Sequence, residues 1–117
     1  MGFLTTHVLD TAQGVPGSNM SVSLYRIANG ERQLLSQQMT NSDGRCEGSL
    51  LKGDAFAVGV YELDFGVEAY FKQANVAQPS PAFLSDVTLR FGIAEAGDHY
   101  HVPLLVSPYS YSTYRGS

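Results

Sequence analysis

The sequence is poor in cysteine and in charged residues. Its single cysteine, Cys46, excludes a disulfide within the chain, so burial and hydrogen bonds must hold the fold, and a lone thiol suits a reducing compartment. Charged residues make up 15% of the chain, the formal net charge is -4, and no run of Lys or Arg occurs. These features argue against nucleic acid or an anionic membrane as a partner.

Long apolar stretches are missing as well. No segment approaches the ~20 apolar residues of a membrane-spanning helix. The first residues, MGFLTTHVLD, do not show the basic region followed by a long apolar region that marks a signal peptide. We therefore expect a soluble, cytoplasmic protein.

Several catalytic motifs are also absent. The chain has no Gly-x-Ser-x-Gly nucleophile motif and no glycine-rich phosphate loop after a predicted strand. Cys46 has no identifiable activating partner. Covalent catalysis is therefore the weaker option for any enzymatic activity.

Short alternating apolar runs, separated by Gly, Pro, Asn and Asp, dominate the chain and predict strands. Eight strands are expected, over 3–10, 20–27, 31–40, 46–51, 56–65, 84–93, 99–107 and 109–115. Asn29-Gly30 favours a type I′ hairpin turn between the second and third. Val67, Tyr70 and Phe71 have helical spacing and predict one short helix over 66–75. We predict an all-β, two-sheet sandwich of eight strands forming one domain, residues 1–117.

The first strand and the strand over 99–107 are partly apolar on both faces. One face of the first carries Leu4 and Val8, yet the other carries Phe3 and Leu9. A sandwich buries only one face of each sheet, and an apolar second face indicates that something else covers it. We expect another subunit to do so.

All three histidines fall on the face opposite the predicted core, because His7, His99 and His101 alternate with core positions. Three imidazoles could form a zinc site, or could act as general acid and base near neutral pH, or could be ordinary strand residues. Arg45, after the Asp43-Gly44 turn, could clamp a planar anionic substrate or simply be solvated. The residue pattern leaves these alternatives open.

Three segments carry a family resemblance: LTTHVLD at 4–10, NSDGR at 41–45, and HYHVPLLVSPYSYSTYRGS at 99–117. Their order and spacing resemble the transthyretin-related proteins, in particular the 5-hydroxyisourate hydrolase family, and the likeness covers essentially the whole chain. The resemblance implies a transthyretin-like sandwich with one short helix. It also implies a homotetramer, assembled as a dimer of dimers, with active sites in the channel between the dimers.

The same resemblance implies a site and a reaction. The catalytic positions fall on His7, Arg45, His101 and Ser117, and the substrate-binding positions on Tyr114, Arg115 and Gly116. His99 lies beside them without an assigned role, and neither a metal nor a cofactor is implied. The expected reaction is hydrolysis of 5-hydroxyisourate to 2-oxo-4-hydroxy-4-carboxy-5-ureidoimidazoline in urate degradation. The alternative is a transthyretin-type binding protein for small, hormone-like ligands.

Overall fold

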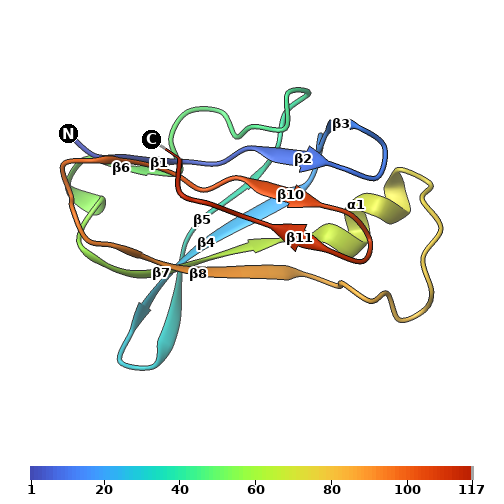
Figure 1. The fold of residues 1–117 in the computed structure, drawn as a ribbon. Helices are drawn as coiled ribbons and strands as arrows, with labels where there is room; N and C mark the ends of the chain where they lie inside the picture. Colours follow the sequence, from blue (N-terminus) through green and yellow to red (C-terminus); the bar gives the residue numbers. More distant parts are fainter. Residues whose placement is uncertain (117) are drawn as a thin grey trace.

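The computed structural model describes residues 1–116 and shows two packed layers of strands with a short helix, α1, at one end (Figure 1). The first layer contains two sheets, ordered β6-β1-β9 and β11-β10-β2-β3. Its strands are β1 (Phe3–Thr5), β2 (Val8–Asp10), β3 (Val15–Pro16), β6 (Leu51–Lys52), β9 (His99–His101), β10 (Leu104–Val106) and β11 (Tyr111–Ser112). The second layer is one sheet, ordered β5-β4-β7-β8. The predicted all-β sandwich is confirmed.

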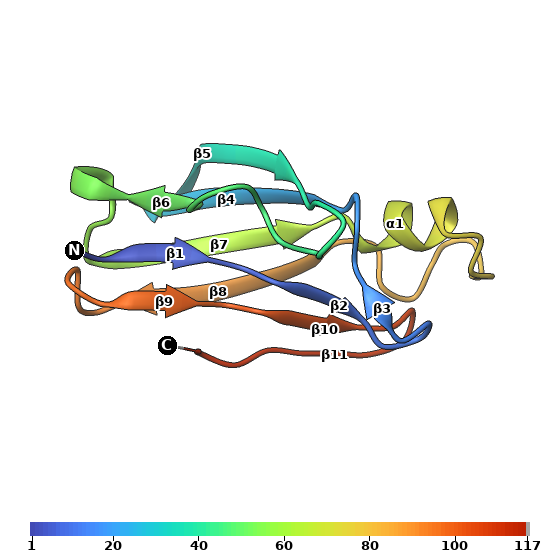
Figure 2. The same cartoon turned by 90° about the horizontal axis from the view of Figure 1, so that it is seen from above.

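The two sheets of the first layer are one continuous surface interrupted at its middle. Figure 2 shows β1 leading into β2 and β9 leading into β10, with the two pairs side by side. The predicted strands over 3–10 and 99–107 therefore each appear as two short strands. The interruption lies at Pro103, which has no N–H to give to the ladder. Val102 and Leu104, on either side, donate to the carbonyls of Thr5 and His7.

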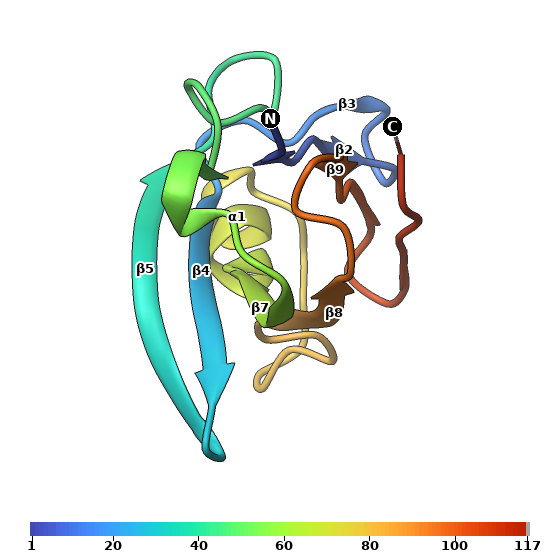
Figure 3. The same ribbon diagram turned by 90° about the vertical axis from the view of Figure 1, so that its left-hand side faces the viewer.

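The second layer consists of β4 (Ser21–Ala28), β5 (Glu31–Met39), β7 (Gly59–Phe65) and β8 (Val87–Ile93), all antiparallel to their neighbours. Asn29 and Gly30 have φ of 54° and 77°, the positive values that a type I′ turn needs, so the predicted hairpin is confirmed. Figure 3 looks along the molecule from the end opposite α1 and shows β5, β4, β7 and β8 facing the first layer.

Two predicted strands are largely wrong in extent. Of the strand expected over 46–51, only Leu51 belongs to a strand, β6, because Gly48 adopts φ of 70° and turns the backbone out of an extended path. A short 3-10 helix, Gly53–Ala55, follows β6. The strand expected over 109–115 is reduced to β11, and the chain beyond it returns to the sheet through a single bridge at Gly116.

The core lies between the layers and follows the predicted alternation. Leu4, Val8 and Leu104 from the first layer are fully buried, and they belong to one hydrophobic cluster with Leu24 and Leu63 from the second. In β1, β2, β9 and β10, the residues that alternate with these core positions are only partly buried, as expected for a face that lies outside the sandwich.

Helix α1 (Val67–Gln73) closes one end of the core and buries Val67, Tyr70 and Phe71, as predicted. The Tyr70 hydroxyl donates to Oδ2 of Asp10 at 2.8 Å, while Oδ1 of Asp10 accepts the N–H groups of Ala12 and Gln13. Asp10 is only 1% exposed, and burial followed by this carboxylate raises the pKa of Tyr70. One buried carboxylate thus joins α1, β2 and the loop after β2. Within residues 1–116, no helix is long and apolar enough to cross a membrane.

We expect Tyr70→Phe to lower the free energy of unfolding by about 1–3 kcal/mol, because it leaves a buried carboxylate oxygen without its donor. Thermal and denaturant unfolding followed by circular dichroism would measure the loss. Tyr109→Phe, at a 61% exposed position, is the matched control and should leave stability unchanged. Equal stability of the Tyr70 variant and the wild type would contradict the bridging role of Asp10.

Candidate active site

The pairing of β1 with β9 places three chemically useful side chains on one outer face. The two strands are parallel, with Phe3 opposite His99 and Thr5 opposite His101. Successive side chains of a strand point to opposite faces, so Thr5, His99 and His101 all lie away from the core. The N-terminal strand and a strand near the C-terminus therefore build the site together.

A cleft of about 350 Å³ opens on this face. Its walls are Thr5, Thr6, Arg45, Cys46, Gly48, His99 and His101. Two of the residues predicted to be catalytic, Arg45 and His101, thus lie in one cavity although they are far apart in sequence. His99, which had no predicted role, lies there too.

His7 is held beside Arg45 by the 41–45 turn. The two residues form an antiparallel bridge, and Val8 N–H donates to the Gly44 carbonyl at 2.8 Å. Gly44 has φ of 78°, and a Cβ there would lie 2.4 Å from the Val8 carbonyl oxygen, so only glycine fits. His7 Nε2 lies 2.9 Å from the Asp43 carbonyl oxygen. A carbonyl only accepts, so Nε2 carries the proton, and Nδ1 is the acceptor of a neutral His7 ring.

The environment of His101 favours its neutral form. Its pKa is lowered from the ordinary 6.5, first by burial and then by the charges of Arg45, His99 and His7. Each of these effects disfavours the imidazolium. A neutral imidazole beside an arginine can accept a proton from water while the arginine holds an anion.

Cys46 lines the same cleft but is not chemically activated. Burial raises the pKa of its thiol to about 11, so it stays protonated and non-nucleophilic near neutral pH. The zinc hypothesis also finds no support in the geometry. Across the described part of the chain, His, Cys, Asp and Glu side chains do not gather in groups of three or more that could hold a metal ion.

The C-terminal segment reaches the site through Gly116. Gly116 N–H donates to the His101 carbonyl at 2.7 Å, and the reverse contact measures 3.4 Å. A Cβ on Gly116 would lie only 3.0 Å from Cδ2 of the His101 ring. The predicted substrate-binding residue Gly116 therefore packs directly against His101, one of the predicted catalytic residues. Ser117 lies outside the described residues.

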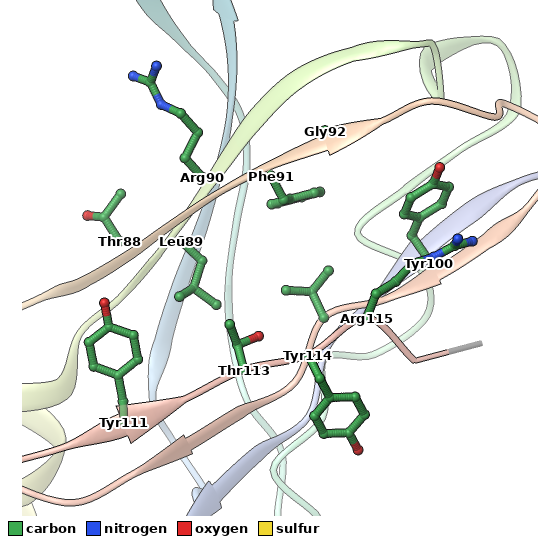
Figure 4. A pocket seen from close by; sticks show the side chains of 11 residues that line it. Thr88, Leu89, Arg90, Phe91, Gly92, Tyr100, Tyr111, Thr113, Tyr114 and Arg115 are labelled. Carbon is green, nitrogen blue, oxygen red and sulfur yellow. The ribbon is translucent and has the colours of Figure 1, made fainter.

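Arg115 and Tyr114 are placed differently. The Arg115 guanidinium lies 3.9 Å from the centroid of the Tyr100 ring, and its Nη2 lies 3.7 Å from Asp98 Oδ2 and donates to the His99 carbonyl at 3.3 Å. It faces a second cleft of about 430 Å³, between β8 and the C-terminal segment (Figure 4). Tyr114 is 60% exposed and borders the same second cleft. Substrate binding by Tyr114 and Arg115 stays a prediction.

Sequence reasoning missed Thr5 as a site residue. Its Oγ1 lies 2.8 Å from His99 Nε2 and 2.8 Å from His101 Nδ1. Period-two alternation places Thr5 on the same face as His7. Nothing in the sequence shows, however, that β1 aligns with β9, so the contact with the histidines could not be read from it.

Comparison with known proteins gives consistent results over the whole chain. The model of the HIUase/Transthyretin family matches residues 4–116. A 5-hydroxyisourate hydrolase of Ralstonia nicotianae is 62% identical over 117 residues, covering 100% of both chains. The structure of Klebsiella pneumoniae 5-hydroxyisourate hydrolase has a TM-score of 0.82 at 33% identity, with 100% of both chains covered. That of (S)-allantoin synthase has a TM-score of 0.95 at 50% identity, and this chain spans 44% of that longer protein.

We expect the pKa of His101 to lie below 6.5 and to rise in Arg45→Gln, because removing the positive charge makes the imidazolium less costly. NMR titration of the ring Cε1–H signals would measure both values. Arg26→Gln, a change on β4 in the other layer, is the control and should leave the titration unchanged. An unchanged His101 pKa in Arg45→Gln would contradict the conclusion that the charge of Arg45 lowers it.

Proposed function

The chain belongs to the HIUase/transthyretin family, and from this membership together with the His101–Arg45 cleft we propose that it is a hydrolase of 5-hydroxyisourate. The reaction adds water to the ring amide carbonyl, breaks the ring C–N bond and yields 2-oxo-4-hydroxy-4-carboxy-5-ureidoimidazoline, a step of urate degradation. The observation that carries the proposal is full-length identity of 62% to a relative named for this activity.

His101 is the proposed general base. Near neutral pH its lowered pKa keeps the ring unprotonated, so it can take a proton from the attacking water as the water adds to the carbonyl. The proton is then available for the leaving ring nitrogen. Because a neutral base is required, activity should decline as the pH falls through the pKa of His101.

Arg45 is the proposed electrostatic partner. It lines the same cleft as His101, and its forked donors suit a planar, oxygen-rich anion. As water adds, negative charge develops on the carbonyl oxygen, and a fixed cation beside it lowers the barrier. The charge of Arg45 therefore has two effects: it stabilises the developing oxyanion, and it keeps the nearby His101 unprotonated.

We propose that the remaining predicted residues assist His101 and Arg45. His7, with Nε2–H held by Asp43, presents Nδ1 as an acceptor that helps to place the water. Gly116 packs against His101 and brings the C-terminal segment to the cleft. We propose that Ser117 acts with the catalytic residues and that Tyr114 and Arg115 help to bind substrate, as the resemblance implies.

A transthyretin-type binding protein is the less favoured alternative. Fold likeness alone does not distinguish carriers from hydrolases. The high identity to a full-length hydrolase favours catalysis, and so does the convergence of a neutral histidine and an arginine in one cleft. A carrier of apolar hormones would not need a depressed imidazole pKa at its site.

We also propose the homotetramer and the single domain over residues 1–117 that were expected from the sequence. The outer face of the first layer supports a subunit contact, because Phe3, Leu9 and Leu105 there are only partly buried in the single chain. The cytoplasmic location stays a prediction. It suits the buried, protonated thiol of Cys46.

The proposed reaction is tested by following the ultraviolet absorbance of freshly generated 5-hydroxyisourate with and without the protein. We expect His101→Asn and Arg45→Ala each to reduce kcat/KM by roughly 10² or more, the contribution usual for a general base or a charge-stabilising group. Arg26→Ala is the control for Arg45. Failure of the wild type to exceed the spontaneous decay would overturn the proposed function, and near-normal rates in either variant would overturn that residue's role.

Gly116→Ala gives a second, narrower test. The added methyl lies 3.0 Å from Cδ2 of His101 and must displace either the ring or the C-terminal segment. We expect kcat to fall roughly tenfold or more with an unchanged melting temperature, since misplacing a reacting group is costly. Gly97→Ala is the matched control, because a Cβ there meets nothing within 4 Å. Equal kcat values for the two variants would show that Gly116 does not position His101.

A further inference from the structure

The Thr5 hydroxyl joins two histidine rings across the β1–β9 pair. It approaches His101 at Nδ1 and His99 at Nε2, both at 2.8 Å. These contacts follow from the parallel register, which sets Thr5 opposite His101 and puts His99 two residues earlier on the same face. The strand register therefore fixes the position of the Thr5 hydroxyl between the two rings.

His99 is held in place from a second direction. Its ring stacks on Phe3 with centroids 4.1 Å apart and planes inclined by 13°. Phe3 is the residue opposite His99 in the β1–β9 register, as Thr5 is opposite His101. The strand pair thus immobilises one face of the His99 ring and directs its Nε2 to Thr5.

The His101 ring is gripped along both of its edges. Thr5 Oγ1 contacts the Nδ1 edge, and the Cδ2 edge packs against Gly116, where even a methyl group would lie within 3.0 Å. Among residues 1–116, these contacts occupy the two edges of the ring, and Nε2 at its far end is the nitrogen left for substrate and water. The orientation of His101 depends on Thr5 as much as on the C-terminal segment.

Hydrogen-bond counting couples the protonation of the two rings. A hydroxyl has one hydrogen to donate and two lone pairs to accept with. Thr5 can therefore donate to only one of the two rings, and the other ring must donate an N–H to it. If His101 Nε2 is to accept a proton from water, the neutral ring must carry its hydrogen on Nδ1, which makes Thr5 the acceptor there. The hydroxyl hydrogen then goes to His99 Nε2.

We propose that Thr5 and His99 form a positioning pair that holds neutral His101 in the Nδ1–H tautomer, with Nε2 free to act as the base. The hydrogen-bond chain runs from His101 Nδ1–H to Thr5 Oγ1, and from Thr5 O–H to His99 Nε2. This assignment rests on the proposed role of His101. It gives Thr5 and His99 a function through His101 rather than through contact with the substrate.

The tautomer is tested directly by ¹⁵N NMR of the histidine rings in the wild-type protein, above the pKa of His101. We expect the Nδ1–H tautomer for His101. A ring found as Nε2–H would overturn the proposal whether or not the protein hydrolyses 5-hydroxyisourate. Conversely, an inactive wild type with the expected tautomer would overturn the proposed function and leave the positioning pair intact.

Thr5→Val removes the hydroxyl at nearly constant shape, and Thr5→Ser retains it. With Val we expect the His101 ring to populate the Nε2–H tautomer and kcat to fall roughly tenfold or more at similar KM, as for other groups that orient a functional histidine. Ser should restore both the tautomer and most of kcat. The charges of Arg45, His99 and His7 also act on His101. The same measurements on Arg45→Gln therefore distinguish an effect of charge on the His101 pKa from an effect of the Thr5 hydroxyl on its tautomer.

The control variant is Thr11→Val in the loop after β2, whose hydroxyl donates to the Val106 carbonyl and which lines neither cleft. Melting temperatures of all variants would show whether a loss of rate follows loss of folding. Wild-type kcat and an unchanged tautomer in Thr5→Val would overturn the proposal. So would a Thr5→Ser variant that behaves like Thr5→Val, because packing and not the hydroxyl would then be the cause. If Thr5→Val does not fold, the wild-type tautomer and the serine variant still decide the question.

Discussion

The parallel pairing of β1 with β9 is the interaction on which the site depends. It joins the two ends of the chain and places Thr5 against His101 and Phe3 against His99. Parallel strands require a long connection, and here the whole second layer and α1 intervene between the two strands. The core must therefore form for the site to exist. Burial of Leu4 and Tyr100 between the layers holds the strands whose opposite faces carry the chemistry.

The surroundings of His101 combine rigidity with electrostatic bias. Thr5 and Gly116 occupy the two edges of its ring, and Arg45, His99 and His7 disfavour its protonation. Neither effect needs a metal ion or an activated nucleophile. In the proposed mechanism, the neutral His101 imidazole supplies the base, and Arg45 supplies the charge stabilisation for hydrolysis of a ring amide.

The C-terminal segment is held in place by Arg115, which faces the second cleft and not the cleft lined by Arg45 and His101. Arg115 stacks on Tyr100, approaches Asp98 and donates to the His99 carbonyl. Tyr100 in turn accepts the N–H groups of Ala94 and Glu95 through its hydroxyl. The next residue, Gly116, lies against His101, whose carbonyl accepts its N–H. The segment is also held by the Thr113 hydroxyl, which donates to the Pro103 carbonyl at 2.7 Å, and by the pairing of β11 with β10.

Local patterns in the sequence were enough to predict the class of fold, the Asn29-Gly30 turn, helix α1 and the core face of β1, β2, β9 and β10, because these depend on side-chain period and turn chemistry. The motif resemblance predicted His7, Arg45 and His101 as catalytic residues, and the structure brings Arg45 and His101 into one cleft. The tertiary structure alone decided three features. These are the break in the strands beside Pro103, the short extent of β6 and β11, and the contact of Thr5 with both histidines. Those features depend on which strands pair and in which register, and register joins residues 96 positions apart through contacts that no local pattern encodes.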